Sequence, residues 1–253
     1  MDFIIHTFQI LLPSLVAAFL TTVICSIIGI ILALLLGILA GFGRLSNVTV
    51  IRSISAFYVE TVRGTPLLFQ LLVWFFGIQI VLITLFNFNV DTLVYSLLTA
   101  LNSNTLFPTE GISKIVFAVI ALSFNYGAYL AEVVRAGVQA VETGQTEAAQ
   151  SLGLGRFQTA RFIVLPQALR IMVPALTNNF ITLIQDTSFF QVIGVAELSL
   201  VIQTAVQSVS SSPTLRATLY TFELLVYFVI CYSLATLSRM YERRVAHTIA
   251  GAH

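Results

Sequence analysis

The sequence predicts an all-α integral membrane protein with five transmembrane helices, its N-terminus on the outer side of the membrane and its C-terminus in the cytoplasm. Composition is the first reason, since 58% of the 253 residues are hydrophobic and 9% are charged, whereas about a quarter of a soluble domain is charged. The mean hydropathy of +0.96 also indicates a membrane protein. The other reasons are five nearly charge-free runs and an uneven distribution of Arg and Lys. This composition excludes an ordinary soluble enzyme and a disordered chain, and a net charge of +1 predicts no nucleic-acid partner.

Five runs are long and apolar enough to cross a bilayer, which takes about 20 residues in a helix. The first has no charged residue between 3 and 43. It is long enough to require a tilt, and it is too long and too poor in Arg and Lys for a cleaved signal peptide. The last two runs each contain one acid, Asp186 and Glu223. We predict spans over 10–40, 64–88, 113–136, 169–195 and 217–238, in one domain over 10–244.

The positive charges orient these spans, because Arg and Lys collect in cytoplasmic segments. Ten of the 12 follow the first span, follow the third span or lie at the C-terminus. Only Lys114 and Arg216 lie on the opposite side. The N-terminus is therefore expected outside and the C-terminus inside, as an odd number of spans requires.

The remaining apolar sequence suits a helix bundle in lipid. Small residues recur at every fourth position of the first span, at Gly29, Ala33, Gly37 and Gly41. This spacing lets two helix backbones approach closely. Cys25 and Cys231 lie in apolar runs, so we expect buried small side chains and no metal site. In the long outer connection 87–113, the stretch 92–101 is expected either at the membrane interface or as an extension of the neighbouring helices, and 102–104 is expected in a turn.

The cytoplasmic segment 138–169 is too polar for lipid but has helical patterns. The stretch 146–152 is rich in helix formers, and Gly153 suits the left-handed residue that ends a helix. A second short helix is expected over 157–165, and Pro166 suits the first turn of the helix that leads into span four. Two short helices outside the membrane would form a rigid knob that can accept force from a soluble partner.

This segment resembles the EAA loop of ABC importer permeases. The residues that match the family pattern are Glu147, Ala148, Ala149, Gly153, Ile163, Leu165 and Pro166. Three further segments, 58–70, 129–137 and 186–188, are similar to the polar amino-acid branch of that family. The resemblance runs from about span one to Arg244, and it implies a type I permease for an amino acid of the histidine, glutamine, glutamate or arginine type.

The resemblance also implies the rest of the transporter. Such permeases work in the bacterial inner membrane as two copies, or as one copy and a paralogue, with two cytoplasmic ATPases and an external amino-acid-binding protein. The chain itself has no GxxxxGK[ST] phosphate loop, so ATP and Mg are expected on the ATPase subunits. We therefore expect neither a cofactor nor catalysis on this chain.

Three acids allow more than one interpretation. Glu147 suits docking to the ATPase, although an acid in the first turn of a helix is also favoured by the helix dipole. Glu60 with Arg63, and Glu132 with Arg135, are spaced for local ion pairs. Alternatively, these four residues link an inner gate to the docking loop.

Span four contains the candidate substrate-binding residues. A carboxylate at mid-membrane depth costs about 3 kcal/mol, and such groups usually face a bundle interior or a wet cavity. Helical spacing places Asn179, Thr182 and Asp186 on one face and Asn178, Thr182 and Gln185 on an overlapping one. We predict that these five residues line the path, the alternative being hydrogen bonds between helices. Similar sequences commonly have Lys where Gln185 stands, so here the stripe contains the acid Asp186 and no basic residue. The resulting negative field is expected to favour a cationic or zwitterionic amino acid.

Two other classes of membrane protein would leave a different pattern in the sequence. An ion-coupled secondary transporter is the alternative, but such folds usually contain internal repeats, and none is visible here. An intramembrane enzyme would need a Ser/His, HExxH or paired-carboxylate arrangement within the spans, which the sequence lacks. The sequence therefore predicts a permease that works by alternating access.

Overall fold

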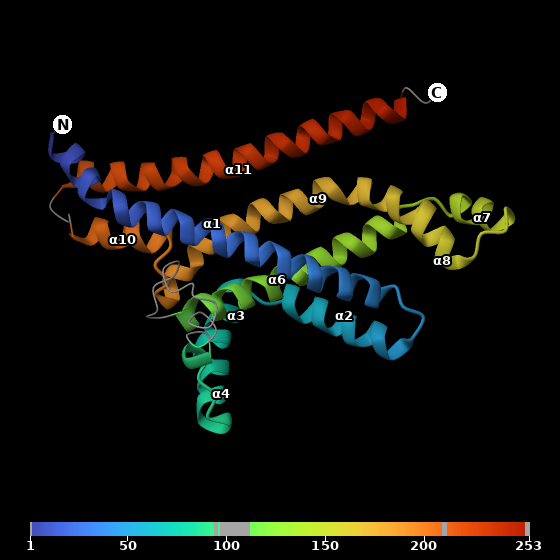
Figure 1. Ribbon diagram of the computed structural model, residues 1–253, viewed down its shortest axis with the longest axis horizontal. Coiled ribbons are helices and arrows are strands. Elements are labelled where there is room, and N and C mark those ends of the chain that lie inside the picture. Colours follow the sequence, from blue (N-terminus) through green and yellow to red (C-terminus); the bar gives the residue numbers. More distant parts are fainter. Residues whose placement is uncertain (1, 94–95, 97–111, 209–211, 251–253) are drawn as a thin grey trace. The chain divides into compact units, whose positions relative to one another are not determined.

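The computed structural model describes residues 2–93, 96, 112–208 and 212–250, and every regular element in these ranges is a helix (Figure 1). Most of the expected interfacial stretch 92–101, and all of the expected turn at 102–104, lie outside the described residues. The helices are α1 (Asp2–Arg44), α2 (Thr49–Arg63), α3 (Leu67–Leu72), η1 (Val73–Ile78), α4 (Gln79–Phe86), α6 (Ile112–Gln139), α7 (Thr143–Ser151), α8 (Arg156–Thr159), η2 (Ala160–Val164), α9 (Leu165–Asp186), η3 (Thr187–Ile193), α10 (Leu198–Ser208) and α11 (Pro213–Ala250).

Five helical runs are long and apolar enough to cross a membrane, which confirms the predicted all-α fold with five spans. They are His6–Arg44, Leu67–Phe86, Ile112–Gln139, Arg156–Ile193 and Pro213–Arg243. The fourth begins well before the predicted 169 because α8, η2, α9 and η3 follow one another without a break.

The expected second short helix over 157–165 is therefore wrong as a separate element. Its residues form α8 and the π-helical turn η2, which continues directly into α9. The N–H of Leu165 bonds to the carbonyl of Ala160, five residues earlier. Pro166 has no N–H, and its ring clashes with the carbonyl four residues before it in a regular α-helix. A wider π turn immediately before the proline is a way to accommodate it without ending the helix.

The chain divides into two compact units, and α1, α6, α9 and α11 each contribute to both. Unit 1 comprises Met1–Ile31, Thr65–Ser123 and Leu183–Val229. Unit 2 comprises Leu32–Gly64, Phe124–Thr182 and Ile230–His253. Each unit has a core of its own.

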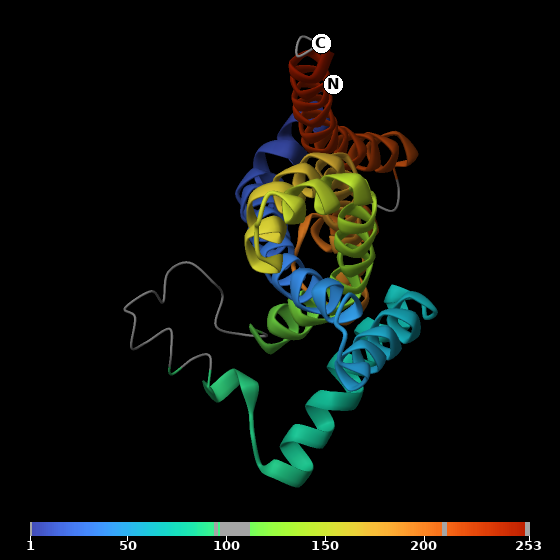
Figure 2. The ribbon, with the colours of Figure 1, turned by 90° about the vertical axis from the view of Figure 1, so that its right-hand side faces the viewer.

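In unit 1, the first part of α1, α10 and the first part of α11 lie side by side (Figures 1 and 2). Their buried contacts include Leu15, Ile202 and Leu219. Glu197, immediately before α10, is fully buried. Its carboxylate accepts hydrogen bonds from the backbone N–H groups of Ser199 and Leu200, both at 2.9 Å, and from the Tyr227 hydroxyl at 3.3 Å. Burial nevertheless raises the pKa of Glu197 to about 7.

In unit 2, the end of α1 packs against α2 and α6 (Figures 1 and 2). The small-residue stripe makes this contact close, because a Cβ added at Gly37 would lie 2.6 Å from the Cβ of Leu130. One added at Gly41 would lie 2.7 Å from the Cβ of Val134. The Tyr58 hydroxyl also joins α2 to α6 by donating to the Phe124 carbonyl at 2.7 Å.

Candidate functional site

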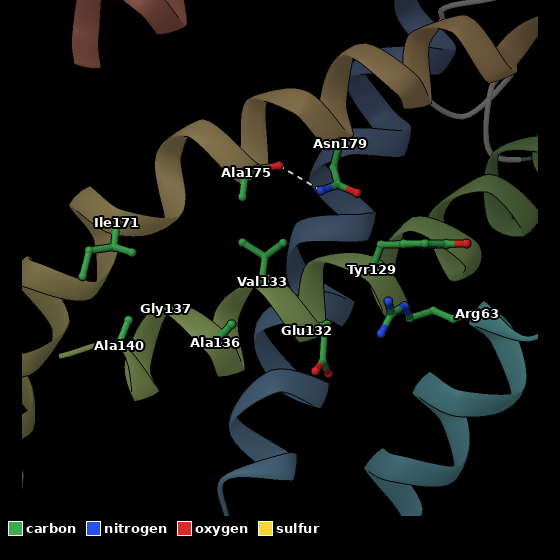
Figure 3. Close-up of a pocket in the computed structure, with 10 residues that line it drawn as sticks. All are labelled: Arg63, Tyr129, Glu132, Val133, Ala136, Gly137, Ala140, Ile171, Ala175 and Asn179. Carbon is green, nitrogen blue, oxygen red and sulfur yellow. Dashed lines mark hydrogen bonds between the residues drawn. The ribbon is translucent and has the colours of Figure 1, made fainter. Parts of the chain in front are cut away.

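A cavity of about 440 Å³ lies within unit 2, among α2, α6 and α9 (Figure 3). Most of its wall is one face of α6, where the lining positions are spaced by three or four residues. Small side chains on that face leave the space open, and Gly137 brings α6 so close to α9 that a Cβ there would lie 2.2 Å from Met172 Cγ. The lining residues are Arg63, Tyr129, Glu132, Val133, Ala136, Gly137, Ala140, Ile171, Ala175 and Asn179.

The carboxylate of Glu132 is held on both oxygens by arginines. Its Oε2 accepts a hydrogen bond from Arg44 Nη1 at 3.0 Å. Its Oε1 accepts from Arg135 Nε at 3.0 Å and also from Arg135 Nη2. Arg135 in turn donates to Gln139 at 2.6 Å. The carboxylate at the cavity therefore has a set position and a largely balanced charge.

Arg63 is the cavity's second charged group and has a different environment. Its guanidinium lies over the Tyr129 ring, with Cζ 5.3 Å from the ring centroid (Figure 3). Among the described residues, no carboxylate lies within ion-pair distance of it. The expected local pair with Glu60 is wrong, because Glu60 instead contacts Arg44 Nη2 at 3.5 Å. The expected pair between Glu132 and Arg135 is present.

The predicted substrate stripe reaches this cavity at one residue. Asn179 lines it and is half-buried, and its Nδ2 donates to the Ala175 carbonyl at 2.8 Å. Asn178 and Thr182 belong to the same unit but have exposed side chains outside the lining. The remaining two, Gln185 and Asp186, end α9 and belong to unit 1.

Sequence reasoning did not assign Arg63, Tyr129 and Glu132 to a binding site. A signal for them was present, since all three lie in the segments 58–70 and 129–137 that carry the family resemblance. Asn125, a polar residue of α6, is buried and does not line the cavity. In the described part of the chain, no three metal-ligating side chains gather at one place.

The loop after α6 forms a compact helical knob in unit 2, where α7 packs on α8 and η2 (Figure 1). The turn after α7 depends on Gly153, whose φ is +85°. The N–H of Gly153 bonds to the Gln150 carbonyl at 2.9 Å, and the N–H of Leu154 bonds to the Ala149 carbonyl at 3.1 Å. These are the two bonds of a Schellman motif, which favours glycine at the left-handed position. The expectation that Gly153 ends this helix is thus confirmed.

The surface of the knob combines charged, small and apolar groups. Glu147 and Ala148 are exposed on α7, whereas Ala149 is buried. Because α7 begins at Thr143, Glu147 is its fifth residue, and the interpretation of Glu147 as a first-turn acid is wrong. Ile163 and Leu165 are half-buried, and Pro166 is exposed. Three large apolar side chains are also exposed, namely Leu152 (82%), Phe157 (75%) and Phe162 (62%).

Comparisons with known proteins agree with this architecture. The chain is 32% identical to the L-cystine transport system permease protein TcyB of Bacillus subtilis, over 94% of this chain and 89% of that one. It is 34% identical to the inner membrane amino-acid ABC transporter permease protein YhdY of Escherichia coli over 88% of this chain. The match covers only about half (54%) of the length of YhdY. A crystal structure of an amino acid ABC transporter with histidines superposes with a TM-score of 0.73 and 30% identity, covering 92% of this chain and 94% of that one.

The family comparison covers most of the chain. Residues 33–247 match the family described as the inner membrane component of binding-protein-dependent transport systems. This range includes the cavity and the whole helical knob. The chain therefore belongs to this family of multi-pass inner membrane transport components.

Proposed function

We propose that the chain is the permease subunit of an ATP-driven importer that moves a polar or charged L-amino acid across the bacterial inner membrane. The relatives that carry amino acids support this function. The observation that carries it is the cavity, which combines a guanidinium, a carboxylate and a carboxamide with small apolar side chains. Its volume of about 440 Å³ is in the range of small-molecule sites. A zwitterion needs opposite charges at one place, and this cavity offers both.

The substrate path then includes the cavity together with the polar stripe of α9. Asn179 belongs to both. Asn178, Thr182, Gln185 and Asp186 are the further residues assigned to the path, where their amide, hydroxyl and carboxylate groups replace water around a charged solute. The bilayer makes such replacement necessary, because a bare ion is expensive in hydrocarbon.

The helical knob is the docking point for a cytoplasmic ATPase. Exposed Leu152 and Phe157 provide the apolar contact area, and Glu147 provides a charge beside it. Interfaces commonly gain most of their energy from a few large side chains of this kind. Two ATPase subunits, which bind ATP and Mg, a second permease copy or paralogue, and an external binding protein complete the transporter. The N-terminus is outside, so that the knob faces the cytoplasm.

Transport proceeds by alternating access. ATP closes the two ATPases, the docked knobs move together, and the spans open the cavity outwards to receive the amino acid from the binding protein. Hydrolysis restores the inward-open state. The π turn η2 joins the knob to α9 without a break in the helix, so movement of the knob is transmitted to a helix that lines the cavity.

The function is tested by reconstitution. The permease and its co-purified ATPase are placed in liposomes with ATP on the ATPase side and amino-acid-loaded binding protein on the other. We expect uptake that requires ATP and the binding protein and that persists when ionophores collapse proton and sodium gradients. Uptake that is independent of ATP and abolished by ionophores would instead identify an ion-coupled secondary transporter.

Docking is tested with a pair of variants on one helix. Glu147→Lys should reduce ATPase association and stimulated transport, whereas Gln145→Lys, which places the same side chain elsewhere on exposed α7, should not. A cysteine at Ser151, on a background without Cys25 and Cys231, should react with an impermeant thiol reagent only from the cytoplasmic side. Reaction from outside would overturn the orientation and, with it, ATPase docking.

A further inference from the structure

We infer that Arg63 binds the α-carboxylate of the transported amino acid, and that the cavity selects neutral and acidic amino acids over cationic ones. The inference rests on the proposed function, since it names the substrate class of the same cavity. It starts from the unequal state of the two charged groups in the cavity wall. Arg63 is without a carboxylate partner among the described residues, whereas Glu132 contacts two arginines.

The charges around the cavity sum to a positive value. Three guanidiniums, those of Arg44, Arg63 and Arg135, meet two carboxylates, those of Glu60 and Glu132. Three positive and two negative charges leave one positive charge, and Arg63 is the cation outside the ion-pair network. A site with this excess attracts an anionic group and disfavours a solute with a net positive charge. This preference differs from the cationic or zwitterionic one expected from Gln185 and Asp186.

The geometry of Arg63 suits a carboxylate. The guanidinium lies over the Tyr129 ring, with Cζ 5.3 Å from the ring centroid, and a cation–π contact of this kind does not require its N–H donors. Arginine presents these donors as a planar fork that can bind a carboxylate with two parallel hydrogen bonds. Arg63 is the last residue of α2, so its side chain enters the cavity from a helix end.

Glu132 can still receive the substrate's ammonium group. A carboxylate has about four acceptor positions, and the arginines occupy three of them. Arg44 and Arg135 are thus positioning residues that set the orientation of Glu132 and balance its charge. Around the charged pair, the wall is formed by Val133, Ala136, Ile171 and Ala175, which leaves an apolar space for an uncharged side chain.

The test uses the permease–ATPase complex in lipid nanodiscs without binding protein, so that only the permease selects. The probes are L-glutamine, L-glutamate, L-arginine and L-glutamine amide, in which a neutral carboxamide replaces the α-carboxylate. For the wild type, we expect L-glutamine to bind about 10- to 100-fold more tightly than its amide, the usual range for one desolvated charged hydrogen bond. We expect L-arginine to bind more weakly than L-glutamine and L-glutamate.

Variants then connect this selectivity to one side chain. Arg63→Gln should lower the affinity for L-glutamine about 10- to 100-fold and equalise it with that for the amide. Arg63→Lys, which keeps the charge but not the fork, should restore part of the difference. The matched control is Arg52→Gln on the same helix, at an exposed residue for which no ion pair is found within the described ranges. This control should bind like the wild type.

The outcomes separate this inference from the proposed function. If Arg63→Gln only lowers thermal stability and keeps the wild-type preference for acid over amide, Arg63 is a structural contact and the inference fails. Equal binding of L-glutamine and its amide by the wild type would also overturn it, with no variant needed. If instead the wild-type complex neither binds nor takes up any amino acid, the proposed function itself fails.

Discussion

Replacing Gly37 by alanine should destabilise the permease, although alanine favours helices more than glycine does. The added Cβ would lie 2.6 Å from Leu130 Cβ, 3.2 Å from the Leu130 carbonyl carbon and 3.3 Å from the Ala131 nitrogen. These atoms belong to the backbone or are attached directly to it, so no side-chain rotation can relieve the contact. Helices α1 and α6 would have to move apart. Gly29 lies on the same stripe of α1, but a Cβ there would lie 3.5 Å from Leu122 Cδ2, an ordinary contact distance.

The magnitude follows from these distances. Carbon atoms pack at about 3.5–4.0 Å, so the 2.6 Å contact requires a local separation of about 1 Å. Overpacking of this kind costs about 1–3 kcal/mol, and the helix propensity of alanine offsets about 1 kcal/mol of it. Gly29→Ala should gain the propensity term without the clash. We therefore expect Gly37→Ala to be about 1–3 kcal/mol less stable than Gly29→Ala.

The assay uses the two native cysteines as reporters. Cys25 and Cys231 are both buried and neither forms a disulfide, so a dye that fluoresces on reaction with thiols reports their exposure as the purified protein is heated. For a chain of this length, 1 kcal/mol corresponds to about 2–4 °C in melting temperature. Gly37→Ala should therefore melt several degrees below Gly29→Ala. If Gly37→Ala melts at or above Gly29→Ala, the close approach of α1 and α6 at this position is wrong.

Three further predictions concern the turn, the path and a buried acid. Gly153→Val should introduce about 1–3 kcal/mol of local strain, because the φ of Gly153 is +85°. The variant should therefore have lower binding-protein-stimulated ATPase activity. The control Gly144→Ala, whose added Cβ would meet no atom within 4 Å, should retain that activity. Asp186→Asn should change uptake per assembled complex about ten- to a hundredfold for cationic, neutral or acidic amino acids, and an unchanged profile with normal assembly would remove Asp186 from the path. Because burial raises the pKa of Glu197 from 4.5 to about 7, the folded state binds this proton more tightly, so the contribution of Glu197 to stability should be highest below about pH 4.5, fall as the pH rises towards 7 and then level off. The difference in melting temperature between the wild type and Glu197→Gln should follow that course, and a difference that is constant from pH 5 to 8 would contradict it.

The sequence by itself determined the fold class and the position of the glycine turn after α7. Five apolar runs can be recognised without structural knowledge, because lipid requires each span to be long, uncharged and internally hydrogen-bonded. Gly153 could be recognised because the left-handed conformation disfavours other residues. The stripe from Gly29 to Gly41 indicated close packing, because small side chains at every fourth position let another backbone approach one face of the helix. It did not show which helix α1 approaches.

Contacts between distant residues were decided by the tertiary structure. The spacing of Glu60 and Arg63 allowed a local pair, yet Glu60 contacts Arg44 and Arg63 lies over Tyr129. The cavity combines α2, α6 and α9, and it includes Asn179 but not the neighbouring Asn178. Which face of a helix turns towards its neighbours depends on how the helices rotate and cross, and periodicity within one helix contains no information about that. The physical reason is that side-chain pairing is set by packing between segments, whereas the apolar spans and the glycine turn are set by requirements within one segment.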